Sequence, residues 1–406
     1  MKTILPKIKF KNFYEKWNRK KLQRIAPLRG GFAFKSEKFQ KCGVPIVRIS
    51  NIKFDGTVGG EFEYYSKINS DEKFVLRGRS ILLAMSGATT GKIAMLDSEE
   101  EYYQNQRVGY FQNTGAVDYD FLSSILQTKE FTNQLNSVLV AGAQPNISSK
   151  EIDSFVFYIP ESLEEQSAIG ALLRTLDDLL SSYKDNLTNY QSLKATMLFN
   201  MFPKAEQTVP EIRLDGFEGE WELIKLGDFC ELITKGTTGK SQSEQGKVNF
   251  VKVENLKDNE IYPIVKISEE EHFGSLKRSI LYEGDILFSI AGTLGRTAIV
   301  KNNILPANTN QALAIIRGYK LDAYFLLVVL SGEVVKDYIR KNPTVGAQPN
   351  LSLEQVSSLK IKIPSLVEQR AIGAYFSNLD NLIKSYQEKI SQLETLKKKL
   401  LQDMFI

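Results

Sequence analysis

Apolar residues recur every three or four positions along two long stretches, from about Leu163 to Met201 and from about Leu366 to Met404. Neither stretch contains proline, and glycine occurs only near the start of each. Such spacing is typical of the seam of a coiled coil. At about 1.5 Å per residue, each stretch predicts a helix of roughly 55–60 Å.

Helices of this length exceed what a globule of about 150 residues covers. We therefore expect the two helices to pack against each other as a coiled coil. The alternative is that each helix lies along its own globule. The apolar positions expected to make the pairing or partner-binding surface are Leu172, Leu176, Leu179, Tyr183, Leu187 and Tyr190 in the first helix, and Tyr375, Leu379, Leu382, Tyr386, Ile390 and Leu393 in the second.

The segments before the helices have a different pattern. Residues 46–52 alternate apolar and polar side chains, as a half-buried strand does, and the apolar runs 81–85 and 286–290 fit buried strands. Helices are predicted at 121–135 and 324–339. The fold class is therefore an α/β (α+β) globule, present in two tandem copies, each followed by a long helix.

The chain is an internal duplication. The pentapeptide Gly-Ala-Gln-Pro-Asn begins at Gly142 and again at Gly346, and the two tryptophans, Trp17 and Trp221, occupy matching places. Such a repeat indicates one structural unit used twice. We divide the chain into a globule over 1–160, a helix over 161–203, a second globule over 204–364 and a second helix over 365–406.

Charge separates the two copies. Residues 1–53 hold 15 basic and 2 acidic side chains, whereas residues 204–364 hold 20 basic and 21 acidic ones. A basic globule favours a polyanionic partner such as nucleic acid, although many lysine-rich surfaces are simply solvated. The sequence shows no signal peptide and no transmembrane stretch, so we expect a cytoplasmic protein.

Candidate catalytic chemistry is sparse. The single histidine, His272, follows three glutamates and is interpreted as part of a solvated surface turn, and two cysteines cannot form a cysteine-rich metal site. The stretches at 87–92 and 236–241 resemble phosphate-binding loops but lack their spacing. We predict no catalytic residue and no metal site in this chain.

Several motifs flank the joints between globules and helices. Gly-Ala-Gln-Pro-Asn is followed in each copy by Ile-Pro, at 159–160 and 363–364, and by Glu-Gln-x-Ala-Ile, at 165–169 and 368–372. With the duplicated globule-and-helix pattern, these motifs resemble the specificity subunit of type I restriction–modification systems along the whole chain. The combination carries the resemblance, since no single motif is specific.

The resemblance implies a DNA-recognition subunit that is non-catalytic by itself. Each globule would be a target-recognition domain reading half of a split double-stranded DNA sequence. The two helices would pair as an antiparallel coiled coil and set the spacing. It also implies two modification (methyltransferase) subunits and additional restriction subunits as partners. S-adenosylmethionine, ATP and magnesium would belong to those partners, with no cofactor in this chain.

DNA contacts are expected from polar and basic side chains in loops, where glycines, hydroxyls and cations can approach phosphates and base edges. The candidates are Arg29, Lys35, Ser86, Thr89, Thr90 and Lys92 in the first globule, and Lys235, Thr237, Thr238, Lys240, Thr293 and Arg296 in the second.

The repeated pentapeptide is interpreted as a structural joint between globule and helix. Its candidate residues are Gln144, Pro145 and Asn146, and Gln348, Pro349 and Asn350. Ser148 with Glu151, and Ser352 with Gln355, have the spacing of a capping box that begins a helix. Direct DNA contact by Gln144 or Gln348 stays open as an alternative.

Two other functions also remain open at this level. A coiled-coil adaptor would use its globules to bind proteins and would not bind DNA. A stand-alone DNA-modifying enzyme would be active as the purified chain, which the missing catalytic motifs argue against.

Overall fold

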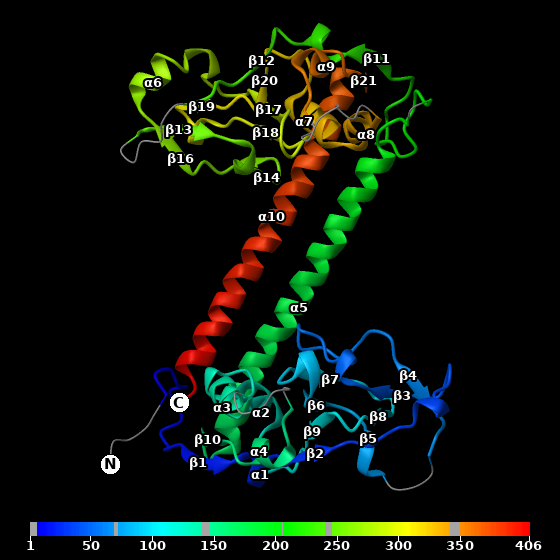
Figure 1. Ribbon diagram of the computed structural model, residues 1–406, viewed down its shortest axis with the longest axis vertical. Helices are drawn as coiled ribbons and strands as arrows, with labels where there is room; N and C mark the ends of the chain where they lie inside the picture. Colours follow the sequence, from blue (N-terminus) through cyan, green and yellow to red (C-terminus); the bar gives the residue numbers. More distant parts are fainter. Residues whose placement is uncertain (1–5, 69–71, 140–145, 205, 240–245, 342–349) are drawn as a thin grey trace. The chain divides into compact units, whose positions relative to one another are not determined.

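The computed structural model describes residues 6–68, 72–139, 146–204, 206–239, 246–341 and 350–406. It divides into two compact units. Unit 1 consists of residues 1–184 with 389–406, and unit 2 of residues 185–388. Each unit therefore contains one globule and a part of both long helices, α5 (Leu163–Asn200) and α10 (Leu366–Asp403) (Figure 1).

The globule of unit 1 contains two four-stranded sheets. One has the order β2 (Leu28–Gly30), β9 (Val108–Phe111), β6 (Ser80–Ala84) and β7 (Ile93–Leu96), with every pair antiparallel. The other has the order β4 (Glu63–Tyr65), β3 (Val44–Val47), β8 (Tyr102–Gln104) and β5 (Val75–Leu76). In that sheet β3 and β8 run parallel.

Short elements complete unit 1. Strands β1 (Asn18–Lys21) and β10 (Val156–Ile159) form an antiparallel pair at the base of α5. The α-helices are α1 (Leu22–Ile25), α2 (Tyr119–Ile125), α3 (Lys129–Leu139) and α4 (Ser149–Asp153). The 3-10 helices are η1 (Ser36–Lys38), η2 (Ile49–Asn51), η3 (Glu72–Phe74) and η4 (Gly87–Thr89).

Unit 2 repeats this topology. Its four-stranded sheet has the order β12 (Leu232–Lys235), β20 (Leu313–Arg317), β17 (Ile286–Ser289) and β18 (Thr297–Ile299). A three-stranded sheet follows the order β16 (Val265–Ile267), β13 (Val248–Val251) and β19 (Ala307–Thr309), with β13 parallel to β19. Strand order and direction match those of unit 1 except that the smaller sheet lacks a counterpart of β5, so the duplication inferred from the sequence is also a duplication of fold.

The remaining elements of unit 2 are short. Two-stranded pairs join β14 (Leu256–Lys257) to β15 (Glu260–Ile261) and β11 (Glu222–Lys225) to β21 (Lys360–Ile363). The α-helices are α6 (Glu269–Phe273), α7 (Ala323–Ser331), α8 (Glu333–Lys341) and α9 (Leu353–Ser357). The 3-10 helices are η5 (Leu226–Phe229), η6 (Val253–Asn255), η7 (Lys277–Ser279) and η8 (Asn302–Ile304).

The helix predicted at 121–135 is in fact two helices. Thr128 lies between α2 and α3, where its hydroxyl donates to the carbonyl of Ile125 and accepts from the amide of Phe131. That hydroxyl ends one helix and caps the next. In unit 2 the break falls at Gly332, between α7 and α8.

The capping boxes expected after each pentapeptide are present. The Ser148 hydroxyl accepts from the Glu151 amide at 3.3 Å, and the Glu151 carboxylate accepts from the Ser148 amide at 2.7 Å. Ser352 and Gln355 make the same reciprocal pair, at 3.0 and 2.8 Å. They begin α4 and α9, as the sequence predicts.

The two long helices pack against each other in antiparallel directions within each unit. In unit 1, Asp177 and Lys184 of α5 pair with Lys397 and Glu394 of α10, so residues farther along one helix meet earlier residues of the other. In unit 2, Lys194 pairs with Asp380, and the rings of Tyr190 and Tyr386 lie 5.4 Å apart. The mutual coiled coil is confirmed.

The predicted pairing positions do not all face the seam. Leu176, Leu379 and Ile390 are buried, whereas Leu179 is 42% exposed. The others are half-buried: Leu172, Tyr183, Leu187, Tyr190, Tyr375, Leu382, Tyr386 and Leu393.

Each globule has its core completed by the end of a long helix that began on the other repeat. The residues at the end of α10, Met404 and Phe405, join the core of unit 1, where the Phe405 ring lies 6.1 Å from Trp17 and 5.4 Å from Phe121. Unit 2 receives Met201 and Phe202 at the end of α5 in the same way. Full burial of Met404 and Met201 contributes about 1.5–3 kcal/mol each.

One sequence interpretation is wrong. His272, expected in a solvated turn, is 5% exposed. It lies in α6, and its Nδ1 is hydrogen-bonded to the Asn308 side chain in β19. Ser268 caps α6 and the preceding glutamates occupy its first turn, where negative charge is favourable, so the segment is a helix with a buried histidine instead of a solvated turn.

Candidate nucleic-acid interface

The loop after β6 gathers several of the predicted DNA-binding residues of unit 1. It forms η4, and Thr89 donates its hydroxyl proton to the carbonyl of Ile49 in η2 at 3.5 Å. Thr90 donates to the carbonyl of Gly87 at 2.6 Å. These local bonds hold the loop in place.

An exposed aromatic side chain completes this cluster, and sequence reasoning missed it. Phe54 stands at the tip of a turn and is 90% exposed. The Lys92 ammonium lies over its ring, and Asp55 fixes the turn by accepting from the amide and hydroxyl of Thr57. A cation with an exposed aromatic ring suits phosphate contact and base stacking. The detectable signal was a phenylalanine inside the turn sequence Lys-Phe-Asp-Gly.

Ser86 precedes this loop and contacts Asn146, the last residue of the first Gly-Ala-Gln-Pro-Asn segment. Ser86 forms an antiparallel bridge with Asn146, and the amide of Ile147 donates to Met85 at 2.9 Å. In unit 2, Asn350 bridges Ala291, and Leu351 donates to Ile290. Each joint asparagine therefore lies beside a candidate DNA-binding loop. The glutamines and prolines at 144–145 and 348–349 lie outside the described residues.

The corresponding loop of unit 2 has the same frame with different side chains. Ser289 donates to the carbonyl of Thr293 at 2.6 Å and accepts from the amide of Arg296 at 2.7 Å. The Arg296 guanidinium donates to the carbonyls of Val253 and Leu256, both at 3.3 Å. Thr293 and Arg296 are both exposed.

The neighbouring turn also differs between the units. Asp258 occupies the place of Phe54, and both Asp258 and Asn259 have positive φ, at 51° and 61°. Short polar residues tolerate that left-handed conformation better than most others. The aromatic tip is therefore a feature of unit 1, and the two units present different chemistry on one frame.

Two further candidates of unit 1 lie on another part of the globule. Arg29 in β2 donates to the Gln104 side chain at 3.2 and 3.3 Å and to the carbonyl of Val75 at 3.1 Å. Its guanidinium also lies over the Tyr110 ring at 4.7 Å, and burial lowers its pKa. Through Arg29, β2 and its own sheet are therefore connected to the second sheet, which contains β5 and β8. Lys35, beside η1, is exposed.

The other candidates of unit 2 follow β12. Lys235 and Thr238 are exposed, and the amide of Thr237 donates to Thr309 at 3.1 Å. A Cβ on Gly236 would lie 2.1 Å from the carbonyl oxygen of Asn310, and one on Gly31 would lie 2.3 Å from that of Asn105. Glycine is therefore needed where each segment passes close to the backbone of another segment, at 309–310 and at 104–105. Lys240 lies outside the described residues.

A comparison with known families identifies the repeated domain. The family model described as "Type I restriction modification DNA specificity domain" matches residues 14–189 and again 218–395. The chain belongs to this family. Its two matches cover the two copies of the repeat, so both units are specificity domains.

Curated specificity subunits resemble the chain over most of its length. The MjaVIII specificity subunit of Methanocaldococcus jannaschii is 23% identical over 342 residues, covering 82% of this chain and 79% of that protein. The EcoBI specificity subunit of Escherichia coli is 23% identical over 435 aligned positions, covering 97% and 86%.

Solved structures support the fold of a specificity subunit. The S subunit of a type I system from M. genitalium superimposes with a TM-score of 0.66 at 17% identity, covering 99% of both chains. A chain from a study of type I complex assembly and conformational transition gives 0.51 at 18% identity, covering 96% of this chain and 97% of that one.

The described part of this specificity subunit offers no metal site and no membrane span. Among those residues, no group of three or more His, Cys, Asp or Glu side chains could hold a metal ion. No described helix is both long and apolar enough to cross a membrane. Burial raises the pKa of Cys230 to about 11, so this thiol is a poor nucleophile at neutral pH.

Proposed function

We propose that this specificity subunit reads a bipartite DNA sequence, one half with each unit. The observation that carries the proposal is that both units share one backbone arrangement but present different side chains from it. The loops after β6 and β17 have matching positions. Lys92 of the first lies against Phe54 of a neighbouring turn, whereas the second presents Thr293 and Arg296. Similar readers with different contact residues suit two different half-sites.

The difference in charge adds to this assignment. Residues 1–53, all within unit 1, carry most of the excess positive charge. Lysine and arginine contacts with phosphates supply sequence-independent affinity, whereas contacts with base edges supply discrimination. Unit 1 is therefore proposed to provide more of the salt-dependent affinity.

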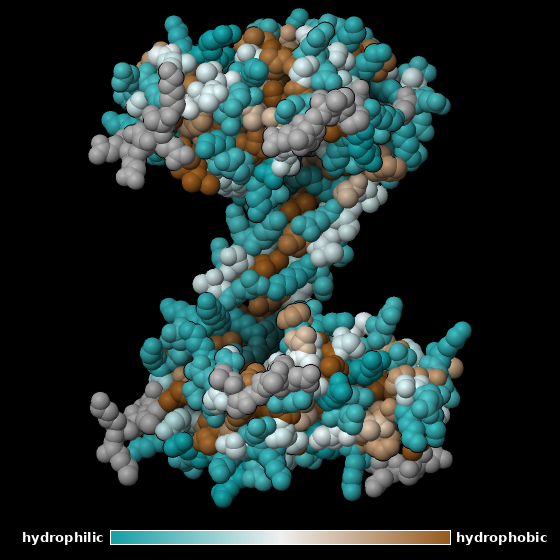
Figure 2. Space-filling view, viewed as in Figure 1, coloured by the Kyte–Doolittle hydropathy of each residue, from teal (hydrophilic) through white to brown (hydrophobic). Residues whose placement is uncertain are grey.

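We also propose that the helix pair docks two modification subunits. The contacts of Asp177 and Lys184 with α10 place Leu179 and Leu396 at one level of the pair, where they are 42% and 44% exposed. In the heptad register both fall on one flank of the seam, while Lys184 and Glu394 occupy the other flank. Figure 2 shows hydrophobic surface along the long helices between polar side chains.

The repeat produces an equivalent pair in unit 2. Leu193, 36% exposed, and the half-buried Leu382 occupy the matching heptad positions. Two equivalent apolar patches suit two copies of one partner better than two unrelated partners. We call Leu179 with Leu396, and Leu193 with Leu382, the flank leucine pairs.

Catalysis in this proposal belongs to the partner subunits. S-adenosylmethionine would bind the modification subunits, and ATP with magnesium would bind restriction subunits. We propose that the complex works in the cytoplasm, where it meets its DNA. Family membership disfavours both the adaptor and the stand-alone enzyme.

Methylation mapping tests the proposed function. Genomes of cells with the gene intact and deleted are compared base by base. We expect one bipartite methylated motif to vanish on deletion and to return when the gene is restored together with its modification subunit. Unchanged methylation, with the modification subunit shown to be expressed and active, would refute the proposal.

A further inference from the structure

A buried glutamine joins each globule to its long helix. In unit 1, the Gln166 amide nitrogen donates to the carbonyl of Pro160 at 2.9 Å, and its oxygen accepts from the backbone amide of Asp118 at 2.9 Å. Pro160 follows β10, Gln166 lies in the first turn of α5, and Asp118 caps α2. One side chain, 1% exposed, thus connects a strand, the long helix and a globular helix.

The same connection recurs in unit 2. The Gln369 amide donates to the carbonyl of Pro364 at 2.9 Å and accepts from the amide of Asp322 at 3.1 Å. Asp322 caps α7, as Asp118 caps α2, and Gln369 is 3% exposed. These glutamines belong to the repeated Glu-Gln-x-Ala-Ile motif, so the structure explains that motif as a docking device.

A glycine one turn farther along each helix allows the close approach. A Cβ on Gly170 would lie 2.5 Å from the backbone nitrogen of Phe121, and one on Gly373 would lie 2.4 Å from the Asp322 carboxylate. Each long helix therefore has its backbone against the start of a globular helix. The buried Ile169 and Leu173 beside Gly170 supply the apolar part of the contact.

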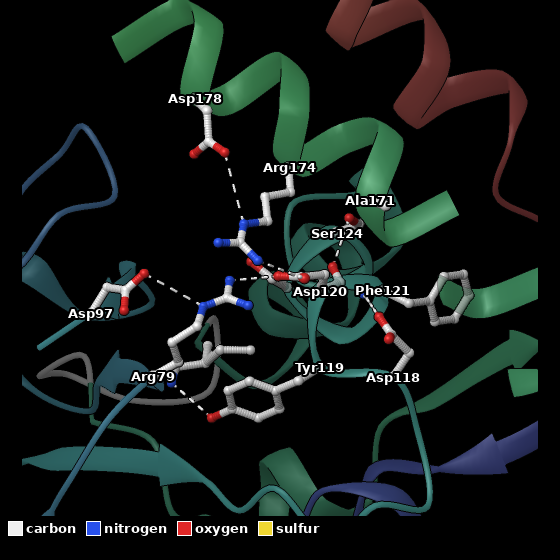
Figure 3. Close-up of polar contacts among 12 residues, drawn as sticks. Arg79, Asp97, Asp118, Tyr119, Asp120, Phe121, Ser124, Ala171, Arg174 and Asp178 are labelled. Atoms are coloured by element: carbon white, nitrogen blue, oxygen red, sulfur yellow. Dashed lines mark hydrogen bonds and ion pairs between the residues drawn. The ribbon is translucent and has the colours of Figure 1, made fainter. Parts of the chain in front are cut away.

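Unit 1 adds ion pairs around this contact (Figure 3). Asp120 of α2 accepts from Arg79 and lies 3.5 Å from Arg174 of α5, and Arg174 also reaches Asp178 at 3.8 Å. The positions matching Asp120 and Arg174 in unit 2 are Tyr324 and Ser377. The ion pairs are therefore particular to unit 1, whereas the glutamine and the glycine are common to both units.

We propose that Gln166 and Gln369 are positioning residues that lock each reading globule at one angle on its helix, and so set how strictly the protein discriminates the spacing between half-sites. This inference rests on the proposed bipartite recognition. Apolar packing is non-directional, whereas two hydrogen bonds from one planar amide fix an orientation. Without the amide, Ile169 and Leu173 still hold the helix, but rotation about the contact is less restricted.

The DNA geometry makes spacing a sensitive readout. One base pair shifts a half-site by about 3.4 Å and turns it by about a tenth of the helical repeat. A rigid reader accepts one spacing, and a looser reader accepts its neighbours as well. A residue that merely stabilises the fold would instead change the rate at every spacing by the same factor.

The experiment uses the complete methyltransferase, assembled from this chain and its modification subunits. Methylation rates are measured on DNA with the native spacer and with spacers one base pair shorter or longer. Gln166→Met and Gln369→Met keep the side-chain volume but remove both hydrogen bonds. Gln191→Met, at an exposed position in α5, is the matched control.

We expect each Met variant at 166 or 369 to lower the preference for the native spacer about tenfold, with the control unchanged. Gln166→Glu provides a second test if the Met variants do not fold. Its protonated carboxyl can both donate to Pro160 and accept from Asp118, so its spacer preference should return as the pH is lowered.

The outcomes separate the two proposals. Wild-type protein that methylates without any spacer preference would refute the proposed function, and the lock with it. Wild-type protein that discriminates while its variants discriminate equally well, or lose rate equally at all spacings, would overturn the lock alone. A Gln166→Glu preference independent of pH would also overturn it.

Discussion

At the scale of single residues, one buried glutamate is stabilised differently in the two units. Glu165 in unit 1 accepts from the Trp17 indole at 3.2 Å, and its Oε2 is buried without a hydrogen-bond partner among the described residues. Glu368 in unit 2 instead forms a bidentate pair with Arg213, at 2.8 and 2.7 Å. Burial raises the pKa of Glu165.

The first prediction follows from this difference. Glu165→Gln should raise the free energy of unfolding of unit 1 at neutral pH by up to about 1 kcal/mol, because it removes a buried charge. The pKa of Glu165 is higher in the folded than in the unfolded state, so its protonated carboxyl contributes most to the free energy of unfolding below the unfolded-state pKa. This contribution is lost as the pH rises through the folded-state pKa. The gain from the substitution should therefore shrink on acidification.

Glu368→Gln is the matched comparison. It leaves Arg213 without its carboxylate and should destabilise unit 2 by about 1–3 kcal/mol at neutral pH. Trp17 and Trp221 are the two tryptophans of the chain, one in the core of each unit, so their fluorescence follows the units separately. The first measurement uses a Trp221→Phe background and the second a Trp17→Phe background. Equal effects of the two substitutions would contradict this account.

Residue-scale chemistry was the least predictable from the sequence. Arg29 reads as a DNA-binding cation, yet its guanidinium is engaged with Gln104 and Val75, which lie 75 and 46 positions away. Phe54 reads as an ordinary turn residue, yet it is almost fully exposed beside Lys92. Such contacts depend on which strands become neighbours, and local pattern does not encode that.

At the scale of elements, the repeat made prediction effective. Apolar spacing located both long helices to within a residue or two at each end, and the duplicated pattern indicated that they pair. The split between α2 and α3 was missed because Thr128 interrupts an otherwise helical pattern with a side-chain bond. The Glu-Gln-x-Ala-Ile motif was noticed, but its docking role requires Asp118 and Pro160 in space.

The ends of the long helices are elements that complete each core, and this yields the second prediction. Phe405→Ala should destabilise unit 1 by about 2–4 kcal/mol, because it removes a ring packed on Trp17 and Phe121. Phe202→Ala should act likewise on unit 2, where its ring packs 5.9 Å from both Trp221 and Phe325.

Unfolding followed separately at Trp17 and Trp221 checks this assignment. Phe405→Ala should move the transition reported by Trp17 more than the one reported by Trp221, and Phe202→Ala should do the reverse. Phe199→Ala, at a position 52% exposed near the end of α5, is the control and should change little. If truncation of Phe405 leaves the Trp17 transition unchanged, the tail of α10 is not part of that core in solution.

At the scale of the whole molecule, the duplication couples two specificity domains and the two proposed docking patches in one chain. A single fold, used twice, can diverge in its loops while its helices keep the same partner surface. Each flank leucine pair takes one leucine from each long helix, so neither repeat can form a patch alone. The proposed docking would therefore depend on the assembled helix pair, and the number of bound partner subunits is the quantity to measure.

The third prediction concerns that stoichiometry. Leu179→Lys with Leu396→Lys places two cations on the patch of unit 1 and should remove one of the two modification subunits, since unpaired charge in an apolar interface is costly. Leu193→Lys with Leu382→Lys should remove the other, and all four changes should leave the specificity subunit alone. Native mass spectrometry of the purified complexes counts the subunits.

Ser181→Lys with Ser391→Lys, at exposed positions away from the leucine flank, is the control. Retention of both partners by the four-lysine variant would move the docking surface elsewhere, and loss of both from either double variant would show that the two patches do not act independently.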